Sequence, residues 1–145
     1  MSNSAVEAEL AIRNLLARMA QLADSEETLE EYLTLFAEDA SWTMLASPSA
    51  ANQESVEYRG RAEILAGALS RRSQGIQGPG SNVLHDLTTI AVTIEDEGRA
   101  RSVAYFKFFG STNDQPKLLL MGQYVDTFER RGGIWQLTSR IIVPA

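Results

Sequence analysis

The chain has 145 residues, a length that suits one domain, 1–145, with a hydrophobic core of its own. The sequence has no cysteine, so disulfides, thiolate nucleophiles and cysteine-based zinc sites are excluded. The net charge of −6 argues against a nucleic-acid partner, because phosphate binding needs a basic surface.

Two helices are predicted at the start of the chain. The first has a capping-box pattern at its beginning and apolar residues at helical spacing over 4–23. Asp24 and Ser25 interrupt this pattern. Ser25 can cap a second helix, from about 26 to 37, whose first turn is acidic, as the helix dipole favours.

A short strand, a loop and a third helix follow. Residues 37–45 alternate apolar and polar side chains, which predicts a strand. Residues 46–58 are small and polar and contain a proline, which is typical of a loop. A helix is predicted over 61–72, and the glycine-rich residues 73–81 form a second predicted loop. The inward face of this helix is predicted to hold Ile64, Leu65, Ala68 and Leu69.

The remainder predicts four long strands joined by turns, at about 82–95, 99–111, 117–130 and 133–143. Strands connected in this way pair antiparallel, and helices that precede a strand meander indicate an α+β fold. Both faces of the middle strands are apolar. One face can pack on the helices, so the other is predicted to meet a partner subunit or to curl around a cavity.

The sequence contains no cofactor or metal motif. There is no Gly-x-Gly-x-x-Gly or Walker pattern, and one histidine without cysteines leaves no plausible metal-ligand set, so we expect no cofactor and no metal. The first residues lack the features of a signal peptide, and no stretch approaches 18 apolar residues. We therefore expect no membrane partner and a cytoplasmic location.

His85, the single histidine, opens the predicted strand 82–95. A neutral imidazole has a pKa near 6.5 and can accept a proton at working pH, although a histidine at a strand start can equally be structural. A carboxylate bonded to the other ring nitrogen would fix its tautomer. Asp86 is poorly placed for this, because adjacent strand residues point to opposite faces.

Three stretches together resemble the SnoaL-like branch of the nuclear transport factor 2 (NTF2)-like superfamily. They are AIRNLLARMAQLAD…LFAEDASWTM (11–44), NVLHDLTTIAV (82–92) and YVDTFERRGGIWQLTSR (124–140). The resemblance covers nearly the whole chain. It implies a cone in which three N-terminal helices pack on a curved, mostly antiparallel sheet that encloses a pocket.

The resemblance also implies site residues. In this branch, which includes polyketide cyclases, dehydratases and a dehydrochlorinase, an Asp and a His meet in the pocket, and these positions correspond to Asp24 and His85. An Arg of the dehydrochlorinase corresponds to Arg140, whereas its Lys aligns with Met19. Scytalone dehydratase uses a second His, which this chain lacks. Asp24 can also be a helix-end residue without a catalytic role.

The last strand and several aromatic residues complete the candidate pocket. Strand alternation places Gln136, Thr138 and Arg140 on one face, with Leu137 and Ile141 on the other. In the interior of a strand, an Arg is either paired at an interface or directed into the cavity, where it would stabilise an anion. The candidate substrate-binding residues are Tyr124, Tyr105, Trp42, Met19, Phe106 and Leu120, for which core packing is the alternative role.

These observations lead to a hypothesis of a cofactor-independent lyase or isomerase acting on a small apolar organic molecule. His85 removes a proton from carbon, Asp24 orients it and Arg140 stabilises negative charge, in a dehydration, another elimination or a cyclisation. Residues 46–58 and 73–81 would cover the pocket mouth. The alternative is a non-catalytic binding or assembly module, since a fold does not define a function. Self-association through the sheet, as a dimer or trimer, is expected in either case.

Overall fold

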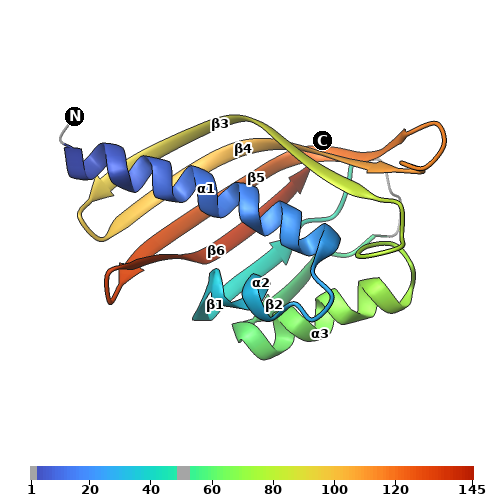
Figure 1. The fold of residues 1–145 in the computed structure, drawn as a ribbon, viewed down its shortest axis with the longest axis horizontal. Coiled ribbons are helices and arrows are strands. Elements are labelled where there is room, and N and C mark those ends of the chain that lie inside the picture. The colour runs from blue at the N-terminus through green and yellow to red at the C-terminus, as the bar shows by residue number, and fades with distance from the viewer. Residues whose placement is uncertain (1–2, 49–52) are drawn as a thin grey trace.

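The computed structural model of the chain describes residues 3–48 and 53–145, and within them six strands form one curved sheet with three helices (Figure 1). The helices are α1 (Asn3–Ser25), α2 (Glu30–Thr34) and α3 (Gly60–Ser73). The strands are β1 (Phe36–Met44), β2 (Val56–Arg59), β3 (Leu84–Asp96), β4 (Arg99–Gly110), β5 (Lys117–Arg131) and β6 (Ile134–Pro144). The predicted α+β class is confirmed.

The second helix is shorter than predicted. Instead of 26–37, α2 covers five residues, and the chain enters β1 directly afterwards. Ser25 does not cap α2, because it ends α1 and its hydroxyl donates to the Gln21 carbonyl at 2.7 Å. The Glu26 carboxylate takes the capping role and accepts hydrogen bonds from two backbone N–H groups of α2, at 3.0 and 3.1 Å.

The sheet has the order β2-β1-β6-β5-β4-β3. The predicted meander from β3 to β6 is confirmed, since each of these strands pairs antiparallel with the next. β1 joins this meander by parallel pairing with β6, and β2 adds an antiparallel edge. The predicted loop 46–58 is therefore wrong at its end, where β2 begins, and residues 49–52 of that loop lie outside the described residues.

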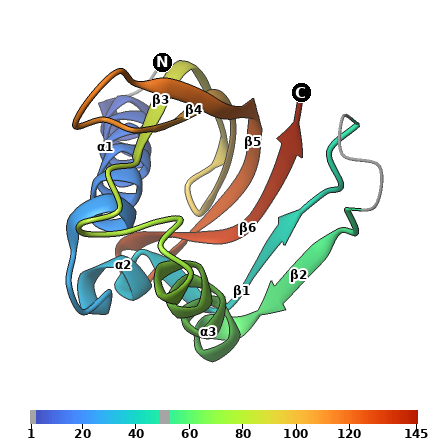
Figure 2. The same ribbon diagram turned by 90° about the vertical axis from the view of Figure 1, so that its right-hand side faces the viewer.

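α1 lies along the concave side of the sheet, which curls around it (Figure 2). A bulge in β3 contributes to this curvature: the register shifts between Thr88 and Ala91, and Thr89 takes a left-handed φ of 53°. An inserted residue of this kind bends a strand and increases its twist. The bend directs the first half of β3, which carries His85, toward the end of α1.

A second bulge changes the predicted faces of the last strand. Thr127 pairs with Ser139 and Phe128 with Leu137, so Thr138 is the extra residue. Leu137 is consequently buried on the same side as Arg140, where strict alternation had predicted opposite sides.

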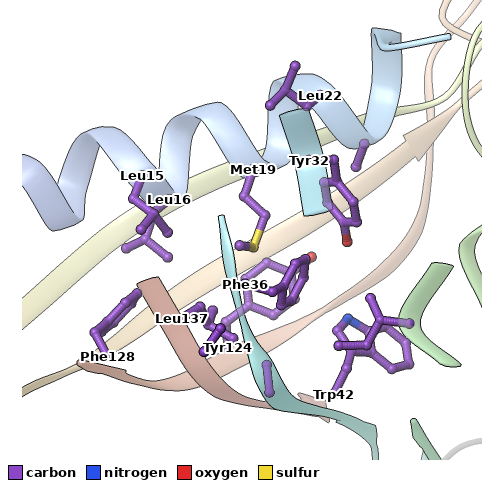
Figure 3. Close-up of a cluster of buried hydrophobic side chains, with 14 of the residues drawn as sticks. Leu15, Leu16, Met19, Leu22, Tyr32, Phe36, Trp42, Tyr124, Phe128 and Leu137 are labelled. Atoms are coloured by element: carbon purple, nitrogen blue, oxygen red, sulfur yellow. The ribbon is translucent and has the colours of Figure 1, made fainter. Parts of the chain in front are cut away.

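The core lies between α1 and the concave face of the sheet (Figure 3). Figure 3 shows Leu16 and Met19 pointing from α1 toward the sheet, where Phe36, Phe128 and Leu137 meet them. Burying an aliphatic or aromatic side chain of this size stabilises the fold by about 1.5–3 kcal/mol. This packing fixes the position of α1 over β5 and β6.

α3 packs on β1 and β2 beside this core. Ile64 and Ala68 are buried as predicted, and Leu65 is partly buried, whereas Leu69 is 50% exposed and was wrongly assigned to the inward face. Within residues 3–48 and 53–145, no helix is long and apolar enough to cross a membrane.

Candidate active site

Asp24 and His85 are in direct contact. α1 continues through Asp24, so this carboxylate extends from the last turn of the helix to the start of β3. Its Oδ1 lies 2.6 Å from the Nδ1 atom of His85, and its Oδ2 accepts the backbone N–H of the same residue at 3.0 Å. Both side chains are largely buried, with 11% and 16% exposed. One carboxylate therefore holds both the ring and the strand that carries it.

This contact defines the tautomer of His85. An ionised carboxylate can only accept hydrogen bonds, so the Nδ1 atom that faces Asp24 carries a proton. In the neutral ring the Nε2 atom is then left as the acceptor. The ring of Phe108, with its centroid 4.6 Å away, packs against the imidazole and limits its rotation. The carboxylate of Asp86, by contrast, lies 3.9 Å from the Lys107 ammonium.

Arg140 forms a buried ion pair with Asp126 from the neighbouring strand β5. Its Nε and Nη2 atoms donate to the two carboxylate oxygens at 3.0 and 2.9 Å. Asp126 is fully buried and Arg140 is 5% exposed. Burial raises the pKa of Asp126, while the charge and hydrogen bonds of Arg140 oppose that shift. The ion pair therefore balances most of the positive charge that the sequence assigned to the pocket.

Tyr124 connects this ion pair to the interior. The Arg140 guanidinium carbon lies 3.9 Å from the centroid of the Tyr124 ring, and the opposite contact of that ring is a stacked Phe106, with centroids 4.4 Å apart. Burial raises the pKa of Tyr124 and also that of Tyr32, against the opposing charge of Arg140. Both phenols therefore stay protonated at neutral pH and keep a hydrogen to donate.

The imidazole of His85 and the side chains of Arg140 and Tyr124 line one cavity of about 420 Å³ between the end of α1, the concave sheet and α3, whereas Asp24 and Asp126 lie behind its wall. His85, Arg140, Tyr124, Trp42, Met19, Phe106 and Leu120 all contribute to its wall. Tyr105 does not, because it lies on the outer face of β4 and is 50% exposed, so its expected role in the pocket is not supported. Met19, at the position of the expected lysine, is a buried apolar part of the wall.

Comparison with known proteins identifies the family. A family model described as SnoaL-like domain matches residues 4–141. The chain belongs to the SnoaL-like domain family. No functionally curated protein matches the sequence of this SnoaL-like protein.

Solved structures establish its fold as NTF2-like. An NTF2-like protein with a cystatin-like fold from Novosphingobium aromaticivorans matches with a TM-score of 0.75 at 22% identity, covering 94% of this chain and 81% of that one. A candidate scytalone dehydratase from the same organism matches with a TM-score of 0.74 at 19% identity, covering 100% of this chain and 89% of that one. A hexachlorocyclohexane dehydrochlorinase, LinA type 2, matches with a TM-score of 0.68 at 15% identity, covering 97% of this chain and 87% of that one.

The cavity of the SnoaL-like protein also contains residues that the sequence did not indicate. Tyr32 and Arg71 were not among the candidate site residues, yet both line the cavity. The predicted mouth loop 73–81 contributes Ile76 and Gln77 to the wall. Gln53 contributes from the other loop, whose residues 49–52 lie outside the described part of the chain.

Among residues 3–48 and 53–145, no group of three or more His, Cys, Asp or Glu side chains is arranged to hold a metal ion. The side chains at the cavity wall provide an imidazole, two protonated phenols and the guanidinium groups of Arg71 and Arg140.

Proposed function

We propose that this SnoaL-like protein is a cofactor-independent lyase or isomerase, with the cavity as its active site. His85 is the general base. Its Nε2 atom removes a proton from a carbon next to a carbonyl group of the substrate, and Asp24 stabilises the imidazolium that forms. A base placed in this way contributes on the order of 10²- to 10⁴-fold to the rate.

A single observation carries this proposal: the 2.6 Å contact between Asp24 and His85, with the histidine at the wall of a cavity. A histidine that served only to complete the strand would not need a buried carboxylate on Nδ1. The carboxylate leaves Nε2 unprotonated in the neutral ring, which is the state that a base requires. The dehydratase and dehydrochlorinase names among proteins of the same fold agree with this reaction class.

The tyrosines provide the second half of the reaction. When carbon loses its proton, negative charge develops on the carbonyl oxygen, and the protonated hydroxyl groups of Tyr124 and Tyr32 can donate to it. Arg140 supports this charge through the ring of Tyr124, since its own charge is shared with Asp126. In an elimination, the electron pair of the enolate forms the new double bond and expels a leaving group from the next carbon, and the imidazolium gives its proton to that group. In an isomerisation no group leaves, and the imidazolium returns the proton to another carbon of the enolate.

The wall of the cavity indicates the substrate class. It is mostly apolar and aromatic, with Trp42, Phe106, Phe108 and Leu120 among its residues. Apolar surfaces of this kind stabilise apolar ligands, while a few polar groups fix their orientation. We infer a small, mostly apolar organic substrate, with elimination or dehydration preferred over cyclisation.

The outer sheet face favours self-association with a second copy of the chain. Val103, Val125 and Ile141 are cross-strand neighbours there, flanked by the exposed Tyr105 and Met121. An apolar row across a sheet is typical of an interface between subunits, and both a dimer and a trimer can bury such a row. In the second candidate function, a non-catalytic assembly module, this face would be the functional surface.

Proton abstraction can be tested without knowledge of the natural leaving group. A panel of small cyclic ketones is incubated with the protein in deuterium oxide, and NMR follows the loss of hydrogen at the carbon next to the carbonyl. Wild type is expected to accelerate this exchange, and His85→Gln to lose the acceleration by about 10²- to 10⁴-fold. A His85→Gln variant that exchanges substrate hydrogens as fast as wild type would disprove the proposed role.

A further inference from the structure

Arg71 lies in the last turn of α3 and lines the same cavity as His85. Its Nε atom donates to the Oε1 atom of Gln77 at 2.7 Å, and Gln77 is buried. Its guanidinium carbon lies 4.7 Å from the centroid of the Trp42 ring. One edge and one face of the guanidinium are thus held by the protein, and the Nη1 and Nη2 atoms remain as donors.

The charges around the cavity are unequal. Arg140 is paired with Asp126, and His85 faces Asp24. Arg71 has no carboxylate within ion-pair distance among residues 3–48 and 53–145, and none of the residues that line the cavity there is acidic. The cavity wall therefore contains a fixed guanidinium, that of Arg71, which no carboxylate of the described residues balances.

We propose that Arg71 binds a carboxylate of the substrate, so that the natural substrate is an apolar organic acid. The planar fork of Nη1 and Nη2 matches the two oxygens of a carboxylate, and such pairs are shorter and stronger than neutral hydrogen bonds. This inference deepens the function proposed above and rests on it, because it takes the cavity to be the reaction chamber. It assigns Arg71 to substrate specificity and His85 to the chemical step.

The position of Arg71 gives the carboxylate an orienting role. Arg71 comes from α3 and His85 from β3, so the two groups approach the cavity from different elements. A substrate anchored by its carboxylate at Arg71 would present its apolar body to Trp42 and Phe106 and its reactive carbon to the imidazole. Binding energy gained away from the reacting atoms then serves to position them.

A matched pair of probes tests the proposal. The ligands 2-naphthoate and 2-naphthamide have the same apolar body and nearly the same shape, but only the first is charged. Isothermal titration calorimetry at pH 8 measures both dissociation constants for wild type, Arg71→Gln and Arg71→Lys. Arg101→Gln is the control, because it removes the same charge from an exposed position on β4. Circular dichroism and thermal melts establish that each variant is folded.

Wild type is expected to prefer naphthoate, and Arg71→Gln to weaken naphthoate binding by about 10- to 100-fold, the range for a charged hydrogen-bonded pair. Naphthamide binding should change by less than about twofold on the same scale. Arg71→Lys should keep part of the preference, and Arg101→Gln all of it. Equal affinity of wild type for the two probes, or an unchanged naphthoate affinity in folded Arg71→Gln, would overturn the proposal.

Titration of His85→Gln separates this inference from the proposed reaction. If that variant keeps the preference for naphthoate while wild type fails to exchange substrate hydrogens, the proton-abstraction mechanism is wrong and the anion site stands. If wild type exchanges hydrogens but shows no preference for naphthoate, the anion site is wrong and the mechanism stands.

Discussion

Replacing Asp24 by asparagine is the most direct perturbation of the candidate site, because it keeps the shape of the side chain and removes its charge. The wild-type carboxylate accepts two hydrogen bonds from His85, one from Nδ1 and one from the backbone N–H. An asparagine can accept at only one of these atoms, and its amide group must donate at the other. If the side-chain carbonyl of the asparagine accepts the backbone N–H of His85, its NH2 group faces Nδ1. That NH2 group can only donate, so Nδ1 must then be unprotonated.

The size of the effect follows from these contacts. A hydrogen bond to a charged group contributes about 1.5–3 kcal/mol, so Asp24 favours the Nδ1-protonated tautomer by about 10- to 100-fold. In Asp24→Asn a neutral hydrogen bond of about 1 kcal/mol favours the Nε2-protonated tautomer instead. The base is then blocked on the side that faces the cavity. We expect catalysis to fall by about 10²-fold or more, and the free energy of unfolding by about 1.5–3 kcal/mol.

Nitrogen-15 NMR of the imidazole measures this directly, and no substrate is needed. His85 is the single histidine of the chain, so after removal of any affinity tag two ring nitrogens give the whole signal. Wild type should show a protonated Nδ1 and an unprotonated Nε2 at neutral ring charge, and Asp24→Asn the reverse. Asp86→Asn is the matched control and should leave the tautomer unchanged. A wild-type ring protonated at Nε2, or an identical tautomer in Asp24→Asn, would refute the assignment of His85 as a base held by Asp24.

Four further outcomes are expected from other parts of the structure. Asp126→Asn leaves Arg140 as an unpaired buried charge and should cost about 3–5 kcal/mol in urea unfolding, whereas the double variant with Arg140→Met should recover much of that loss. The free energy of unfolding should fall as the pH rises above about 10. The unfolded chain loses the Tyr124 proton there, whereas burial raises the pKa of the phenol in the folded protein and keeps it protonated. The expected slope is about 1.4 kcal/mol per pH unit, and Tyr124→Phe should reduce it. Ile141→Glu places a charge in the outer apolar row, so sedimentation analysis should show a smaller species than wild type, and an unchanged mass would argue against that interface. Gly122→Ala should destabilise the fold by about 1–3 kcal/mol in the same unfolding assay, since its added Cβ would lie 2.2 Å from the Val143 carbonyl oxygen.

Long periodic segments were the predictable part of the fold. The apolar spacing of α1 and the length of the four late strands determine those elements locally, and the structure agrees with both. The short α2 depended on a contact that spacing does not reveal: the Glu26 carboxylate caps it, and Leu29 turns the chain with a φ of 61°. Likewise, β2 (Val56–Arg59) forms within a segment that was predicted to be a loop, because β1 offers an edge to pair with, which is a property of the tertiary structure.

The candidate site depended on register as well as on residue type. The tight turn pairs Arg131 with Ile134, and continued regular pairing would place Asp126 opposite Ser139. The bulge at Thr138 shifts this by one residue, which brings Asp126 opposite Arg140. From the sequence, Arg140 was expected either to be paired at an interface or to be directed into the cavity, and its partner Asp126 was not foreseen. Nothing in the sequence indicated the inserted residue that joins them.

The sequence also did not predict that Arg71 lies at the cavity wall. The lysine of the dehydrochlorinase aligns with Met19, so the sequence predicted that this charged group is missing, and Met19 is buried in the core. The structure instead places Arg71 at the cavity wall, from a helix that the sequence treated as packing alone. The cavity therefore has a positively charged side chain at its wall, but this side chain belongs to α3 and has no acidic partner among the described residues. In the proposed function, substrate preference and the position of the base are set by different elements, α3 and β3.

Asp24 connects the fold to the proposed chemistry. It is separated from His85 by 61 positions in sequence, and the packing of α1 on the concave sheet brings the two together. One carboxylate oxygen accepts the backbone N–H of His85 and so joins the start of β3 to the end of α1, and the other orients the imidazole. A shift of α1 along the sheet would therefore change the tautomer of the base as well as the shape of the cavity. Leu16 is buried between α1 and the sheet and does not line the cavity. A conservative cavity-forming substitution such as Leu16→Ala should therefore alter the NMR signal of His85 through the position of α1 before it unfolds the protein.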